Sequence, residues 1–227
     1  MNSNNTVLSC NALIYSDLTA PQIWLIICGI VVVLLMLAFI LYLVINSSIR
    51  KKRFKEAYGK SIYQIAMDND YYLVNTFGFS VDSNTDVLID HILFGDRYIF
   101  CIADVRYQGV VEGKENDQIW FFYPNGIRKK KQPIGNPLTE NKKKIEKLSL
   151  LTGADRTFFI SLVVFNNDCY IDDIQTTSRD EYIRNVKELS RLIKAIESRP
   201  IENMDPKALE KAVQDIAKLK EKFENRK

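Results

Sequence analysis

Charged side chains interrupt a stretch of the chain that is otherwise suited to burial, VLIDHILFGDRYIFCIADVRYQGVVEG. The stretch predicts two apolar strands, about 87–94 and 98–106, joined by a tight turn. Asp90, Asp104 and Arg106 lie within these strands, where a buried charge is costly unless it is paired or binds a metal. Carboxylate oxygens are ligands for Mg²⁺, which can activate water and neutralise the charge of a phosphate.

The length of the turn decides whether these charges meet. A three-residue turn at 95–97 places both aspartates on one face with Arg106, because side chains alternate along a strand. A two-residue turn reverses the parity and directs Asp90 away from Asp104. The shared face predicts a divalent-metal site, while an ion pair between Asp104 and Arg106 is the structural alternative.

Other residues offer weaker signals for chemistry. His91, the single histidine, alternates away from Asp90 and is interpreted as a buried, hydrogen-bonded structural residue. Residues 120–123, WFFY, offer rings for base stacking but are typical of a core strand. Basic runs, which suit phosphate contacts and equally suit a solvated surface, occur at Lys142–Lys144 and at Arg128, Lys129, Lys130 and Lys131.

Segments with the apolar spacing of helices and segments typical of strands surround these residues. Together they predict an α/β (α+β) domain of about 150 residues. Strong signals are a helix over 138–153, an apolar central strand over 157–165 and a helix over 178–198. The remaining predictions are a helix over 50–67, β-rich residues 71–79, strands at about 109–112 and 118–123, a loop over 124–137 and a last helix opening at Asp205-Pro206.

An uncharged apolar run, Ile23–Ile45, is long enough to span a bilayer. Residues 1–49 contain no Lys or Arg, whereas a basic cluster follows at Arg50–Lys55. The positive-inside rule therefore predicts a single-pass protein of the cell membrane, with the N-terminus outside and the main domain cytoplasmic. A cleaved signal peptide is excluded because the basic flank lies on the wrong side and the apolar run is too long.

These observations divide the chain into five parts. The four cysteines show no metal-ligand spacing and are interpreted as reduced thiols. The parts are a short extracytoplasmic N-terminus (1–22), a transmembrane helix (23–45), a basic linker (46–57), a main domain (58–199) and an amphipathic C-terminal helix (200–227).

Several short motifs within about 55–165 together resemble the NERD, or nuclease-related, domain. They are IDHILFGDRYIFCIADVRYQGVVEG, then IWFF, then NPLTEN after a basic loop. The resemblance implies a restriction-endonuclease-like core, a central mixed sheet flanked by helices, that uses Mg²⁺ or Mn²⁺. It places Asp90 at the metal-binding aspartate, Asp104 at the glutamate and Arg106 at the lysine of the family pattern. A transmembrane helix before such a domain is a familiar layout of this family and implies a bacterial source.

The sequence also departs from the family pattern. Asp104 is one methylene shorter than glutamate, and Arg106 stays protonated, so it cannot act as a general base. Gly59-Lys60 stands where the family has Gly-Glu, which leaves Glu56, one helical turn earlier, as the replacement acid. Asn136 and Pro137 match directly, and Glu140 replaces a glutamine.

Three functions remain open at this point. The first is a membrane-anchored protein that binds DNA or RNA and cleaves it at a metal held by Asp90 and Asp104, with Arg106 on the phosphate. The second is a non-catalytic binding or scaffolding module of the same fold at the membrane. The third is a structural membrane protein whose C-terminal helix recruits a protein partner.

Overall fold

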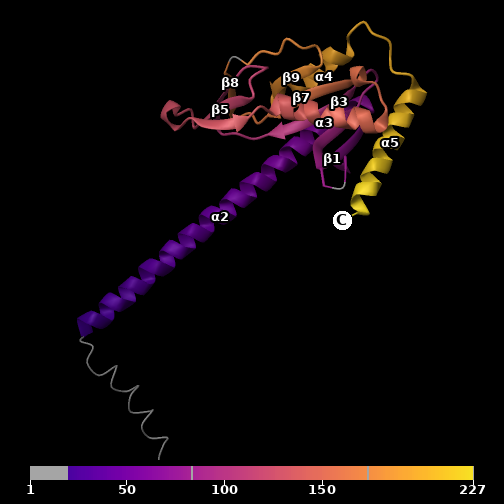
Figure 1. Ribbon diagram of the computed structural model, residues 1–227. Helices are drawn as coiled ribbons and strands as arrows, with labels where there is room; N and C mark the ends of the chain where they lie inside the picture. The colour runs from indigo at the N-terminus through magenta and orange to yellow at the C-terminus, as the bar shows by residue number, and fades with distance from the viewer. Residues whose placement is uncertain (1–19, 83, 173, 227) are drawn as a thin grey trace, which may run out of the picture. The chain divides into compact units, whose positions relative to one another are not determined.

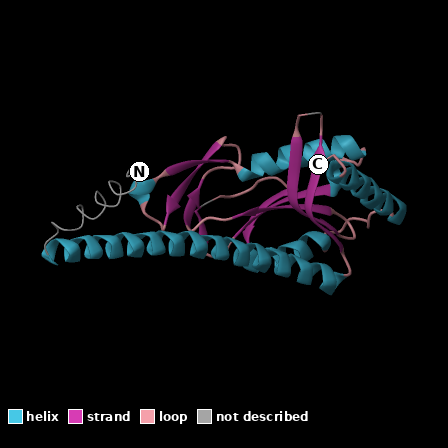
Figure 2. Ribbon diagram, turned by 90° about the horizontal axis from the view of Figure 1, so that it is seen from below, coloured by secondary structure: helices cyan, strands magenta, loops and turns pink. Residues whose placement is uncertain are grey.

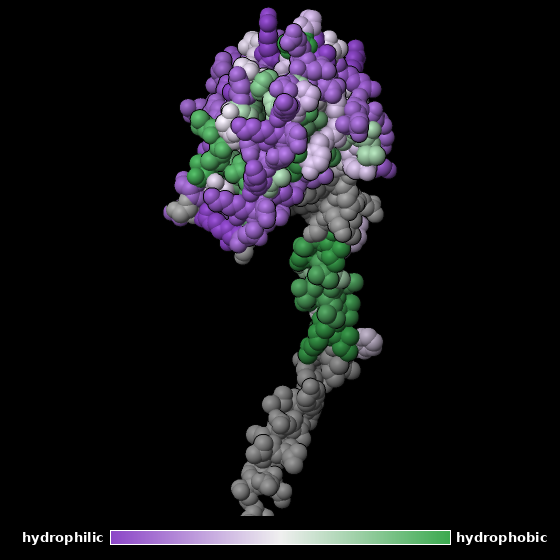
Figure 3. Space-filling view, turned by 90° about the vertical axis from the view of Figure 1, so that its right-hand side faces the viewer, coloured by the Kyte–Doolittle hydropathy of each residue, from purple (hydrophilic) through white to green (hydrophobic). Residues whose placement is uncertain are grey.

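The computed structural model describes residues 20–82, 84–172 and 174–226 (Figure 1). It divides into two compact units at Glu56 and Ala57. The first unit contains most of helix α2 (Ala20–Asn69), in which Trp24–Ile45 is apolar and long enough to cross a membrane. The side chains of this segment are exposed and form a hydrophobic band in Figure 3.

The second unit is built around a mixed five-stranded sheet (Figure 2). Its antiparallel half pairs β1 (Tyr72–Ser80) with β2 (Asp86–Phe94) and β2 with β3 (Ile99–Val105). Its parallel half pairs β3 with β7 (Phe159–Phe165) and β7 with β9 (Glu181–Asn185). β7 is buried along its whole length, as expected for a central strand that is apolar on both faces.

A second sheet of four short strands has the order β6-β5-β4-β8. Its core contains Trp120, whose ring is fully buried and whose Nε1–H donates to the carbonyl oxygen of Lys114 at 2.8 Å. The prediction that residues 120–123 form a core strand is confirmed for Trp120 and Tyr123. The strands are β4 (Gly109–Glu112), β5 (Ile119–Pro124), β6 (Gln132–Gly135) and β8 (Cys169–Asp172).

Helices α3 (Pro137–Thr152) and α5 (Pro206–Glu224) pack on the five-stranded sheet. Asn136 caps α3 by accepting the N–H groups of Leu138 and Thr139, and Gly153 ends it with φ of 66°. Asp205 caps α5 in the same manner. The other helices among the described residues are α4 (Leu189–Glu197) and three short 3₁₀ turns, η1 (Arg128–Lys130), η2 (Arg156–Phe158) and η3 (Val186–Glu188).

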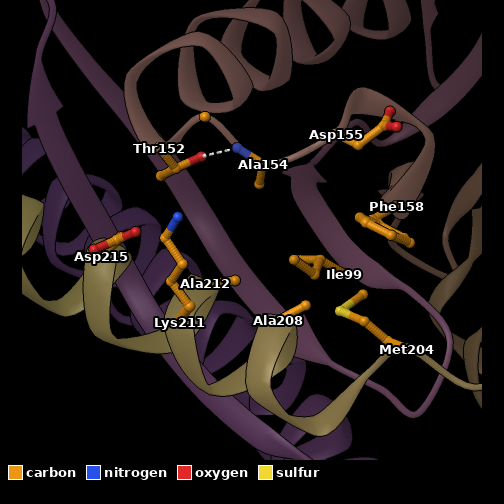
Figure 4. A pocket seen from close by; sticks show the side chains of 11 residues that line it. Ile99, Thr152, Ala154, Asp155, Phe158, Met204, Ala208, Lys211, Ala212 and Asp215 are labelled. Carbon is orange, nitrogen blue, oxygen red and sulfur yellow. Dashed lines mark hydrogen bonds between the residues drawn. The ribbon is translucent and has the colours of Figure 1, made fainter.

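A cavity of about 170 Å³ lies between α5 and the end of α3 (Figure 4). Apolar side chains of Ile99, Phe158 and Met204 line it, and Lys211 and Asp215 approach it from α5. Ligand pockets usually enclose about 300–1,000 Å³. This space is therefore smaller than a site for a nucleotide.

The predicted helix over 178–198 is wrong in its first half. Residues 181–185 form β9, which pairs in parallel with β7, and the helix proper begins at Leu189. The apolar spacing that suggests a helix also fits a strand followed by a helix. Pairing with the buried β7 decides between them, because a ladder satisfies the backbone of both strands.

The loop predicted over 124–137 and the stretch after β7 contain more structure than expected. The loop includes η1 and the edge strand β6, and β8 follows the central strand β7. These strands have four residues each, which is too short for a periodicity to be recognised.

A buried carboxylate links the β2–β3 turn to α4. Glu197 is 6% exposed, and its Oε2 accepts the backbone N–H of Arg97 at 3.1 Å. Burial raises the pKa of Glu197 above its ordinary value, and nearby Asp96 raises it further. The folded state therefore binds this proton more tightly than the unfolded chain does.

The Glu197→Gln variant tests whether protonation of Glu197 stabilises the folded state. The contribution of Glu197 to stability is present below its unfolded pKa and is lost as pH rises through its higher folded pKa. We expect the variant to lose less unfolding free energy than the wild type between acidic and neutral pH. Urea unfolding of the full chain in detergent measures this, with exposed Glu202→Gln as the control. Parallel pH profiles for wild type and Glu197→Gln would contradict this stabilisation.

Candidate functional site

The turn between β2 and β3 has four residues, which changes the register expected for the charged side chains. Phe94 pairs with Ile99, and the Gly95 N–H closes the turn on the Tyr98 carbonyl oxygen at 2.8 Å. The prediction of a three-residue turn is therefore wrong. The turn has an even number of residues, so the side chains alternate as the two-residue alternative predicts. Strand alternation then directs Asp90 and Asp104 toward opposite faces of the sheet.

The shared face expected for the two aspartates is therefore not observed, but the Asp90 side chain contacts the backbone of Asp104 where the β2–β3 ladder stops. The last paired residues are His91 and Ile102. Beyond them, Oδ2 of Asp90 accepts the backbone N–H of Asp104 at 3.1 Å. A side chain thus takes the place of the next backbone partner at this edge. Asp90 is exposed and Asp104 is half-buried, so the junction is open to solvent on the Asp90 side.

His91 lies on the Asp104 side of the sheet and contacts its carboxylate. Its Nε2 is 2.9 Å from Oδ2 of Asp104, and its Nδ1 is 2.6 Å from Oδ1 of Asn75 on β1. The expectation of a buried, hydrogen-bonded histidine is confirmed, since His91 is 5% exposed. Its contact with Asp104 was not predicted from the sequence, because His91 and Asp104 share a face only when the turn has an even number of residues. This hydrogen bond fixes the orientation of the Asp104 carboxylate.

The strand facing this junction has an unusual backbone conformation. Thr76 of β1 has φ of 51°, and it lies between the pairs Asn75–His91 and Phe77–Ile89. It is therefore directly across from Asp90. A β-branched residue at positive φ is an outlier, and such strain is concentrated at functional sites. The positive φ of Thr76 and the position of Asp90 therefore indicate the same part of the sheet as a candidate site.

Tyr58 of α2 borders the site from the helix. Its hydroxyl donates to the carbonyl oxygens of Val164 at 3.2 Å and Val105 at 3.4 Å. Burial raises the pKa of Tyr58 well above its usual value, the Asp104 carboxylate raises it further and Arg106 opposes this. Tyr58 therefore stays protonated and joins the ends of β3 and β7 beside both charges.

The remaining site residues taken from the family pattern have varied environments. Arg106 is exposed just after β3, and Lys60 is exposed on α2. The side chain of Glu56, the proposed replacement acid, lies outside the described residues. Asn136 has a structural role, because its Nδ2 also donates to the carbonyl oxygens of Glu115 at 2.9 Å and Asp117 at 2.7 Å.

The basic run after β5 belongs to the four-stranded sheet. Arg128 forms ion pairs with Glu112 and Asp172, each at 3.2 Å, and is therefore held in place. Lys131 Nζ lies 3.5 Å from the centre of the Phe121 ring. Lys129 and Lys130 are exposed and form no ion pair within the described part of the chain. These two lysines are the members of the run best placed to meet a phosphate.

Asp90 and Asp104 are the two carboxylates at the junction of β2 and β3 that could hold a divalent cation. Mg²⁺ is commonly held by one or two carboxylates, with water and substrate phosphate completing its shell. The Asp90 carboxylate contacts the backbone N–H of Asp104, whereas the Asp104 carboxylate contacts His91 on the opposite face of the sheet. A cation held by both would therefore require the two carboxylates to turn toward each other. Among residues 20–82, 84–172 and 174–226 there is no group of three or more His, Cys, Asp or Glu side chains arranged to hold a metal.

Comparison with known proteins gives two matches of limited extent. Residues 54–166 match the family model described as the nuclease-related domain, NERD. An uncharacterized protein of Bacillus anthracis is 23% identical over 125 residues, which cover 55% of this chain and 57% of the relative. The chain thus spans somewhat more than half the length of that relative. No solved structure matches the chain significantly.

Proposed function

We propose that the protein binds nucleic acid at the membrane and cleaves it with a divalent metal, on the basis of the match of residues 54–166 to the nuclease-related (NERD) family model. The observation that carries the proposal is the hydrogen bond from the Asp104 backbone N–H to Oδ2 of Asp90, which brings the two residues into contact at the end of the β2–β3 ladder. The apolar segment Trp24–Ile45 would anchor the protein, and the basic cluster after it favours a cytoplasmic domain.

In this proposal each residue of the site has a separate role. Asp90 and Asp104 would hold Mg²⁺ or Mn²⁺, and His91 would keep the Asp104 carboxylate oriented. The bound cation would supply activation of water and neutralisation of charge at the phosphate. Arg106, which is exposed and permanently charged, would bind a phosphate oxygen and would not remove a proton.

A cleavage assay on the full chain in detergent tests the proposal. Labelled single- and double-stranded DNA and RNA are incubated with Mg²⁺, with Mn²⁺ or with EDTA. Cleavage is expected with either metal, and it should be lost in EDTA and in the double variant Asp90→Asn/Asp104→Asn. Cleavage that persists in the double variant would assign the activity to another site or to a contaminant.

A second candidate function is non-catalytic binding of nucleic acid. It is favoured by the bond between His91 and Oδ2 of Asp104, which occupies one carboxylate oxygen, and by Arg106 in the place of a lysine. This candidate predicts binding that is independent of metal and weakens steeply with salt. Binding without cleavage in the assay above would select it.

The exposed pair Lys129 and Lys130 provides a prediction shared by both candidates. The Lys129→Glu/Lys130→Glu variant should weaken nucleic-acid binding and reduce the slope of log K against log salt by roughly two, because each phosphate contact contributes about 0.9. Fluorescence anisotropy over a salt series measures the slope. The matched control, Lys194→Glu/Lys207→Glu, changes two exposed lysines elsewhere. Equal slopes for both variants would exclude Lys129 and Lys130 as contacts.

A further inference from the structure

A larger cavity, of about 670 Å³, lies at the opposite ends of the parallel strands from Asp104. Its lining includes Tyr98, which precedes β3, Ile160 near the start of β7, and Asp180, which precedes β9. Asp104 lies near the carboxyl end of β3, so the two places are separate. We propose that this cavity binds a small phosphorylated ligand through Arg199.

Arg199 is held in a fixed orientation by two tyrosines. Its guanidinium carbon lies 5.6 Å from the Tyr98 ring centre and 5.7 Å from the Tyr182 ring centre. Its Nη1 donates to the Tyr98 hydroxyl at 3.4 Å, and its Nη2 donates to the Tyr182 hydroxyl. These contacts use two of the five guanidinium N–H groups. The guanidinium is therefore positioned in advance and still has donors for a ligand.

The charge of Arg199 is not balanced by a carboxylate. The side chain is half-buried, yet no ion pair to an acid is present for it among the described residues. Charges withdrawn from water are usually paired, and the two tyrosine hydroxyls are neutral. A half-buried guanidinium with only neutral partners on the wall of a cavity favours an anionic occupant.

The surrounding charges strengthen the preference for an anion. Asp180, the acid in the lining, is paired with Arg156 at 3.2 Å. Arg179 lines the same cavity, is exposed, and fixes the Tyr182 ring by accepting its hydroxyl proton on the backbone carbonyl oxygen at 2.7 Å. Two guanidinium groups from different segments match a dianion, and arginine forks bind phosphate oxygens in pairs.

The size of the cavity sets the class of ligand. A volume of about 670 Å³ lies within the range of about 300–1,000 Å³ usual for small-molecule sites. It accommodates more than a bare phosphate ion. The class is therefore phosphate monoesters, and a nucleoside monophosphate is a suitable probe.

The test is calorimetric titration of the full chain in detergent with inorganic phosphate and with adenosine monophosphate. Arg199→Gln should weaken binding of both by about tenfold or more, through loss of a charged bidentate contact. Tighter binding of the nucleotide than of phosphate would assign part of the affinity to the organic group. The matched control is Arg191→Gln, which changes an exposed arginine on α4 and should leave binding unchanged.

Two further variants keep the result interpretable. Arg179→Gln, at an exposed position, should weaken binding without disturbing the tyrosine contacts of Arg199. Asp90→Asn/Asp104→Asn should bind the nucleotide as the wild type does, because the cavity is separate from the proposed cleavage site. Absence of wild-type binding at millimolar ligand, or equal binding by Arg199→Gln and Arg191→Gln, would overturn the proposal.

Discussion

The Asp104→Asn variant is expected to lose metal-dependent cleavage of nucleic acid, with a fall in rate of roughly a hundredfold or more. The amide has nearly the shape of the carboxylate but lacks its charge, and a metal site with two carboxylates would lose half of its anionic ligands. Stabilisation of several kcal/mol by a bound cation corresponds to a loss of this size. Initial rates on a labelled substrate with saturating Mg²⁺ measure the effect.

Asp96→Asn is the matched control for this variant. Asp96 is exposed in the turn of the same hairpin, and its side chain is not part of the junction. It should retain the wild-type rate, and circular dichroism should show both variants folded. Equal rates for Asp104→Asn and the wild type would remove Asp104 from the chemistry and leave the non-catalytic function as the better account.

The Gly109→Ala variant should have the largest effect on stability, a loss of about 3 kcal/mol or more in unfolding free energy. Gly109 opens β4 with φ of 146°, a conformation that side chains rarely adopt. A Cβ there would lie 2.1 Å from the Tyr123 carbonyl oxygen and 2.8 Å from the Asn125 nitrogen. Both neighbours are backbone atoms and cannot rotate away. Chemical unfolding of the full chain in detergent measures the loss.

Gly59→Ala is the corresponding control. Gly59 lies within helix α2, and no atom lies within 4 Å of the position that its Cβ would occupy. Alanine favours helix over glycine by about 0.5–1 kcal/mol, so this variant should be neutral or slightly more stable. A similar loss of stability in both variants would show that the strained backbone at Gly109 is not the cause.

The sequence was sufficient for elements whose signal is local. The apolar span, the strands flanking the charged turn and the helix after Asn136-Pro137 each depend on composition, spacing or a capping residue. Gly153 ends that helix as predicted, in the left-handed conformation. The mixed sheet flanked by helices, implied by the resemblance to nuclease-related domains, is the fold observed.

The sequence was insufficient where distant pairing decides the structure. Residues 181–185 have the apolar spacing of a helix but complete the sheet beside β7. At the candidate site, one residue in the length of the β2–β3 turn changed which side chains share a face. His91 therefore reaches Asp104 although the expected register directed it elsewhere. Arg97 of this turn is bonded to Glu197, a hundred residues away, and no local pattern in the sequence indicates such a contact.

The central claim is that Asp90 and Asp104 together hold a divalent cation. The most direct measurement is calorimetric titration of Mn²⁺ into the full chain in detergent, for the wild type and for Asp90→Asn/Asp104→Asn. The account predicts one binding site in the wild type that is absent from the double variant, while Asp96→Asn keeps it. Equal Mn²⁺ binding by the wild type and the double variant, or no binding by either, would contradict the claim.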